Sequence, residues 1–172
     1  MGRRERFRRG GLHAIQGMAV AAVVAAAGSA QAFAMCVRPA EEAALTARVL
    51  QTEMMVAALA CGQQSQYNAF VIKFRDDLVA HGHALKTFFT RVHGAQADRR
   101  LGTFVTRLAN DASARSRAAA NFCSEAFAFF TTAMATAPAD FEKLAETHNT
   151  SVDHGFAACT TEQVSSRATA TE

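Results

Sequence analysis

The sequence lacks the short motifs that mark the common enzyme and cofactor classes. Its four cysteines form no C-x-x-C pair, which excludes a thioredoxin-type redox motif, and no C-x-x-C-H, which excludes covalent c-type haem attachment. It has no His-Glu-x-x-His or comparable metal spacing, no glycine-rich phosphate loop and no nucleophile motif of the Ser-His-Asp kind. Internal repeats and the alternation typical of strands are also missing. These absences predict an all-α protein that is not an enzyme.

Excess positive charge is also missing once the first 34 residues are set aside. Residues 1–34 contain five Arg and one Glu, a net +4, whereas the whole chain carries +3. The remainder is therefore −1 at neutral pH, and the alkaline isoelectric point belongs to the N-terminal segment. Because a nucleic-acid-binding domain needs a basic surface, nucleic acid is excluded as a partner.

The first 34 residues have the layout of an export signal. Arg-rich residues precede an Ala- and Val-rich run over Ala14–Ala27, and two A-x-A cleavage patterns follow at Ala30–Ala32 and Ala32–Ala34. This order is typical of a secretory signal peptide. It predicts a cleaved signal over 1–34 and a periplasmic or secreted protein of the bacterial envelope. The alternative is a membrane-anchored domain with an uncleaved signal, and only then is a membrane expected as a partner.

Residues 35–160 are expected to fold as one helical domain, with 161–172 as a flexible C-terminal tail. Pro39–Cys61 is the predicted central helix, because it has no internal Pro or Gly, begins with a Pro suited to the first turn and is followed by Gly62 as a cap. Its large apolar residues form two stripes, whereas a surface helix shows one. We therefore expect other helices to cover this helix on both sides.

Three further helices are predicted from apolar residues spaced four and three apart. The second spans Tyr67–Val92, with Gly82 as the place where it could bend. The third spans Asp98–Ala133, has a small and polar middle that could bend or approach a neighbour closely, and keeps an apolar rhythm that only Arg115 breaks. A shorter fourth helix ends near His148. The expected fold is an antiparallel four-helix bundle with two disulfides.

The expected topology restricts how the four cysteines pair. An even number of cysteines in an exported chain indicates disulfides. Cys36 and Cys61 flank a helix that, at 1.5 Å per residue, separates them by more than about 30 Å, which is beyond disulfide reach. If neighbouring helices are antiparallel, the third helix reaches the level of Cys61 near Cys123. The predicted disulfides are therefore Cys61–Cys123 and Cys36–Cys159.

Two features could carry chemistry. His81 and His148 stand at stripe positions where apolar residues are expected, and facing helices could bring them together around haem or a metal with Met54 as a third ligand. The favoured interpretation is core or boundary histidines, so no cofactor and no metal are predicted.

Glu53 lies between the apolar stripes of the central helix, which indicates partial burial beside an Arg or a protonated His. A structural ion pair is favoured there over an acid/base site.

The end of the third helix holds more aromatic surface than one stripe can bury. Phe127, Phe129 and Phe130, together with Phe141, are predicted to form an interaction surface or to line a pocket. The expected function is a binding or structural interaction module, with an unknown protein or a small apolar ligand as the partner. A haem- or metal-binding bundle that uses His81 and His148 with a Met ligand is the alternative from a different class.

Overall fold

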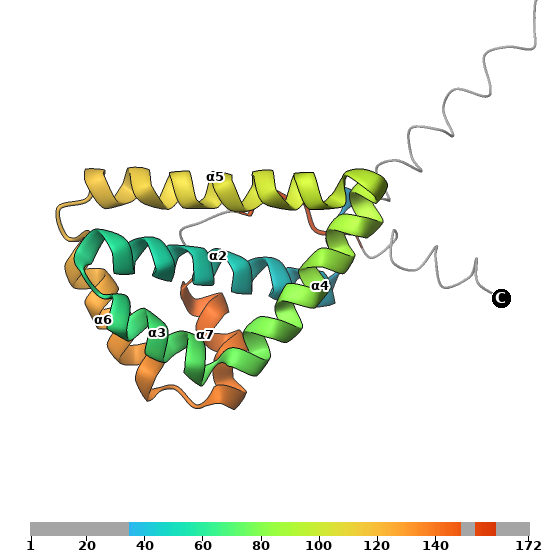
Figure 1. Cartoon of the computed structure of the whole chain (residues 1–172). Helices are drawn as coiled ribbons and strands as arrows, with labels where there is room; N and C mark the ends of the chain where they lie inside the picture. The colour runs from blue at the N-terminus through green and yellow to red at the C-terminus, as the bar shows by residue number, and fades with distance from the viewer. Residues whose placement is uncertain (1–34, 149–153, 161–172) are drawn as a thin grey trace, which may run out of the picture.

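The computed structural model of the chain describes residues 35–148 and 154–160 (Figure 1). The predicted signal peptide over 1–34 and the predicted tail over 161–172 lie outside the described residues. Within the described part the chain is helical and forms no strand, so the all-α class is confirmed there. The elements in order are α2 (Pro39–Cys61), α3 (Gln64–Lys73), α4 (Arg75–His93), the 3₁₀ turn η1 (Gly94–Gln96), α5 (Ala97–Ala118), α6 (Phe122–Ala135), the 3₁₀ turn η2 (Pro138–Asp140) and α7 (Phe141–His148).

Helix α2 is the centre of the fold, as its two stripes predict. It contacts α3, α4, α5, α6 and α7. On one side Leu45 and Val49 belong to a buried cluster with the side chains of α4 and α5, and on the other Leu50 and Met54 belong to a second cluster with α3, α6 and α7. Leu59, a large apolar residue near the end of α2, is exposed and belongs to neither cluster. The two clusters together place a single helix at the middle of a small domain.

The composition of α2 would also suit a membrane span. Among the described residues it is the one helix long and apolar enough to cross a bilayer, by length and composition alone. However, 61% of its apolar window is buried inside the protein. Its apolar character is therefore explained by the two clusters that enclose it. Gly62 then ends the helix in the left-handed conformation, with φ of +70° and its N–H donated to the carbonyl of Ala58.

The predicted second helix is divided at Phe74 and not at Gly82, which lies inside α4. The division falls where the chain changes neighbours, because α3 packs on α2 and α6 whereas α4 packs on α2 and α5. Phe74 is fully buried, with its ring centroid 5.2 Å from those of both Phe70 and Phe141. Burial of this ring against two others accounts for the position of the break better than the conformational freedom of Gly82 does.

The predicted third helix is also divided, and here the chain reverses. Helix α5 ends at Ala118, residues 119–121 turn, and α6 runs back beside α3 (Figure 1). Lys73 Nζ at the end of α3 donates to the carbonyl of Met134 near the end of α6, at 2.5 Å. A continuous helix would carry Phe130 past the end of α2 into water, whereas the reversal leaves Phe130 fully buried. The four continuous helices of the predicted bundle are therefore not observed.

The two predicted cysteine pairs are nevertheless the ones that the structure forms. Cys61 and Cys123 have their sulfur atoms 2.04 Å apart, and Cys36 and Cys159 are bonded as well. This prediction required only that the third predicted helix reach the end of α2 near Cys123. The reversal at residues 119–121 takes place at that end of α2, so it does not separate Cys123 from Cys61. The Cys61–Cys123 disulfide therefore ties the first turn of α6 to the last turn of α2.

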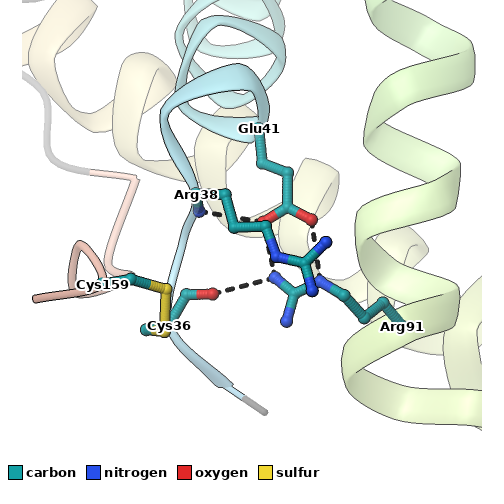
Figure 2. Close-up of polar contacts among 5 residues, drawn as sticks. All are labelled: Cys36, Arg38, Glu41, Arg91 and Cys159. Carbon is teal, nitrogen blue, oxygen red and sulfur yellow. Dashed lines mark hydrogen bonds and ion pairs between the residues drawn. A yellow bond between two sulfur atoms is a disulfide. The ribbon is translucent and has the colours of Figure 1, made fainter. Parts of the chain in front are cut away.

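A network of polar contacts closes the other end of the domain (Figure 2). Arg91 of α4 donates from Nε to Glu41 Oε1 at 2.8 Å and from Nη2 to Glu41 Oε2 at 2.5 Å, and Nη2 also donates to the Cys36 carbonyl at 2.8 Å. The N–H of Arg38 donates to the same Glu41 carboxylate at 2.9 Å and so satisfies a donor at the start of α2. One carboxylate thus caps α2 and holds α4 beside the Cys36–Cys159 disulfide.

The segment 154–160 is docked onto the same end. Val37 donates its N–H to the Ala157 carbonyl at 2.9 Å and accepts from the N–H of Cys159 at 2.8 Å, which forms an isolated parallel bridge. His154 Nε2 lies 2.6 Å from Glu42 Oε1, and the ring of Phe156 packs on the aromatic rings of α4 and α5. The end of the described chain is therefore part of the folded domain.

Candidate functional site

An open cavity of about 760 Å³ lies between α2, α5, α6 and α7. Pockets of about 300–1,000 Å³ are typical of small-molecule sites. Most of the side chains around it are apolar, and a few polar ones are grouped with them. The lining residues are Glu53, Met54, Ala57, Ala112, Arg115, Ala118, Ala119, Phe122, Glu125, Ala126, Ala128, Phe129, Thr132, Leu144, Thr147 and His148.

Small side chains explain why this space stays open. Alanine lines the cavity from three helices, at Ala57 of α2, Ala112 of α5 and Ala126 of α6 among others. The reversal after α5 then places α6 across from the alanine face of α5, so the two helices enclose a space that neither fills. The small middle of the predicted third helix was expected to allow a bend or a close approach to a neighbour. The chain does bend there, because α5 ends at Ala118 and the reversal occupies residues 119–121, and Ala118 and Ala119 also border the cavity.

The polar wall of the cavity is an ion-paired group of three side chains from three helices. Glu53 of α2 bonds through Oε1 to Arg115 Nη2 of α5 and through Oε2 to His148 Nε2 of α7, the latter at 2.8 Å. The Glu53 side chain is only 13% exposed. A carboxylate this buried needs such partners, and the sequence-based expectation of an Arg or His partner is confirmed for both residue types.

A tilted contact with an aromatic ring helps to hold His148 in place within this group. Its ring centroid lies 4.0 Å from that of Phe129, which lines the same cavity from α6. The imidazole therefore contacts both the Phe129 ring and the Glu53 carboxylate. Arg115 was recognisable in the sequence only as the residue that breaks the apolar rhythm of the third helix, and its partner could not be named from that signal.

The structure separates the two histidines of the haem or metal alternative. His81 packs on Phe141 with ring centroids 5.6 Å apart, and its Nε2 is 3.9 Å from Glu142 Oε1, at the start of α7. His148 ends α7, about 10 Å further along that helix. Met54 lines the cavity with His148 but is fully buried. In the described part of the chain, no group of three His, Cys, Asp or Glu side chains is placed to hold a metal ion.

The predicted aromatic surface needs correction. Phe130 and Phe141 are fully buried and belong to the core cluster beside α2. The reversal turns the Phe130 side of α6 inward, and Phe141, at the start of α7, packs on the rings of Phe70 and Phe74. Phe127 is 54% exposed, as an interaction surface requires. Phe129 is partly buried and lines the cavity together with Phe122. Of the two roles expected for these rings, a pocket lining describes Phe129 and a surface describes Phe127.

Comparison with known proteins found no matching family model, no matching curated protein and no matching solved structure. The function proposed below therefore rests on the cavity and on the side chains that line it.

Proposed function

We propose that this protein is an exported, disulfide-stapled binding module of the bacterial envelope that holds a small, mainly apolar molecule in the cavity between α2, α5, α6 and α7. The observation that carries this proposal is a cavity of about 760 Å³ with an apolar lining and one compact polar group. A mostly hydrophobic lining with a few placed polar groups is what small-molecule sites have in common.

Binding is favoured over catalysis by the state of Glu53. A general base needs a carboxylate oxygen that can approach the proton it removes. Both oxygens of Glu53 are already engaged, Oε1 by Arg115 and Oε2 by His148. Glu53 is therefore better suited to hold two donors in place than to exchange protons with a substrate.

Export is supported by the disulfides and by the N-terminal sequence. Disulfides persist in oxidising compartments, and the described part of the chain holds two and no free cysteine. The basic and then Ala-rich start of the chain is typical of a signal peptide. Both features agree with a periplasmic or secreted location.

The mass of the purified protein tests the export proposal. We expect protein recovered from the periplasm to begin near Phe33 or Met35 and to be lighter than the fully reduced chain by about four hydrogens. Intact mass spectrometry under non-reducing denaturing conditions measures both values. A full-length chain in the membrane fraction would support the anchored alternative, and four free thiols would contradict the disulfide assignment.

Filling the cavity tests the binding proposal. A neutral apolar fluorophore such as N-phenyl-1-naphthylamine should bind the native protein and gain fluorescence as it leaves water. Ala128 is exposed and lines the cavity, so Ala128→Trp should occupy space there without overpacking the core. We expect this variant to weaken probe binding by about ten-fold or more, which corresponds to about 1.4 kcal/mol.

Ala135→Trp is the matched control for this substitution. Ala135 is also an exposed alanine of α6, but it does not line the cavity. Probe affinity in this variant should stay within about two-fold of the native value. Equal loss in both variants, or no probe binding by the native protein, would overturn the assignment of the cavity as a binding site.

A further inference from the structure

The polar side chains of the cavity differ in how many of their hydrogen-bonding groups are already used. Thr132 and Thr147 donate their hydroxyls to carbonyls one turn earlier in their own helices, at 3.1 and 2.7 Å. Glu125 is exposed and accepts from Asn121 Nδ2 at 2.5 Å in the first turn of α6. These three side chains are engaged locally, so they add little to recognition of a molecule in the cavity.

Arg115 and His148 are different, because each retains donor capacity after its bond to Glu53. A guanidinium carries five N–H donors in a planar fork. In the described part of the chain, the Arg115 side chain makes one hydrogen bond, the ion pair with Glu53, and this bond uses Nη2. His148 uses Nε2 on the same carboxylate, and its second ring nitrogen remains to donate or accept. Both residues line the cavity.

The donors that Arg115 and His148 retain favour an anion at this wall. Glu53 and Arg115 neutralise each other, and both Glu53 oxygens are occupied. The lining holds two carboxylates, and both oxygens of Glu53 already bond to Arg115 and His148, so a cationic headgroup at this wall would face Arg115 and would find its acceptor at the exposed Glu125. A carboxylate or phosphate would instead receive charge-assisted hydrogen bonds from the Arg115 fork.

The apolar side chains that line the rest of the cavity indicate an apolar body for the ligand. Met54, Ala57, Phe122, Ala126 and Leu144 offer no hydrogen-bonding side-chain groups apart from the thioether. A molecule that fits both parts has an apolar body and one acidic end. We infer that the cavity binds an amphipathic anion of the alkyl carboxylate or alkyl phosphate class, with its acidic headgroup on Arg115 and His148. This inference rests on the proposed function of the cavity as a binding site.

A headgroup series tests the inference by displacement of N-phenyl-1-naphthylamine below the micelle concentration. The competitors share one chain and differ at one end: dodecanoate, dodecyl phosphate, dodecanol and dodecyltrimethylammonium. We expect the two anions to bind at least about ten-fold more tightly than dodecanol and the cation to bind most weakly. The order of dodecanoate and dodecyl phosphate distinguishes a free fatty acid from a phosphate-bearing lipid as the source of the shared chemistry.

The variant Arg115→Gln should then remove the preference. We expect it to weaken dodecanoate binding by about ten-fold or more and to leave dodecanol binding within about two-fold. Arg117→Gln removes the same charge from the same helix at an exposed position outside the cavity and should change neither affinity. Unchanged dodecanol binding also shows that the variant is folded. If Arg115→Gln does not fold, the inference is tested instead by dodecanoate binding to His148→Gln and by the order in which the native protein binds the four headgroups.

The possible failures can be told apart. If dodecanol or the cation binds as tightly as dodecanoate to the native protein, the headgroup assignment is wrong and the apolar binding site stands. If Arg115→Gln keeps the native preference for the anion, Arg115 is not the recognising group. If neither the neutral probe nor any competitor binds, the proposed function of the cavity fails together with the inference.

Discussion

Replacing Cys36 and Cys159 together with alanine is expected to lower the free energy of unfolding by about 4 kcal/mol. In the chain-entropy model a disulfide stabilises by restricting the unfolded chain, and the effect grows with the length of the closed loop. These cysteines are 123 residues apart, but the Cys61–Cys123 bridge lies inside that loop and shortens the path to roughly 60 residues. Domains of this size are stable by about 5–15 kcal/mol, so the loss is a large share.

Alanine substitution of Cys61 and Cys123 is the matched comparison. These residues are 62 apart, so the model predicts a similar loss of about 4 kcal/mol. The two variants should differ in ligand binding. Phe122, beside Cys123, lines the cavity, whereas Cys36 and Cys159 lie at the other end of α2. Only the Cys61/Cys123 variant should weaken binding of the neutral probe. Denaturant unfolding and probe titration measure the two effects, and losses under about 1 kcal/mol in both variants would contradict the entropic account.

The centre of the fold could be predicted from sequence because the relevant signal is local. Two apolar stripes, a Pro at the first turn and Gly62 at the end define α2 without reference to any other segment. The length of α2 also excludes the Cys36–Cys61 pairing. The choice between the two remaining pairings needed the antiparallel arrangement of neighbouring helices as well. The bounds of α2 and the exclusion of Cys36–Cys61 depend only on helix geometry, which a change of neighbours does not alter.

The division of the second and third predicted helices could not be predicted in the same way. The apolar rhythm continues through Phe74 and through residues 119–121 almost without interruption. What decides each break is the neighbour available on either side of it. Phe130 would be exposed beyond the end of α2 on a continuous helix and is fully buried after the reversal. Such a gain comes from tertiary packing, which overrides a local helical preference.

The candidate site shows the same limit at the level of side chains. The position of Glu53 between two apolar stripes indicated a buried carboxylate and the types of partner it needs. Which Arg and which His would serve depended on α5 and α7 reaching the middle of α2 from opposite sides of the cavity. The cavity itself arises from the reversal, so no pattern within one helix could reveal it.

Replacing Arg91 with methionine is expected to lower the free energy of unfolding by about 3 kcal/mol. The side chains of Arg91 and Glu41 are only 15% and 13% exposed, and the guanidinium forks onto both carboxylate oxygens. Removing one partner of a buried ion pair leaves the other charge without compensation, which typically costs 3–5 kcal/mol. Arg91 also donates to the Cys36 carbonyl, so the variant loses a tie to the end of the domain that the disulfide closes. Urea unfolding measures the loss from the shift in midpoint.

A double-mutant cycle with Glu41→Gln separates the ion pair from lost packing. Glutamine keeps an oxygen that can accept from the Arg38 N–H. Because it carries no charge, no unpaired buried charge remains when Arg91 is also replaced. The double variant should therefore lose at least about 1 kcal/mol less than the two single losses added together. Lys86→Met is the control, because Lys86 and Asp98 form an exposed pair at 3.7 Å and its loss should cost less than about 1 kcal/mol. Additive losses at Arg91 and Glu41 would mean that the Arg91 stem, and not its charge, stabilises this end of the domain.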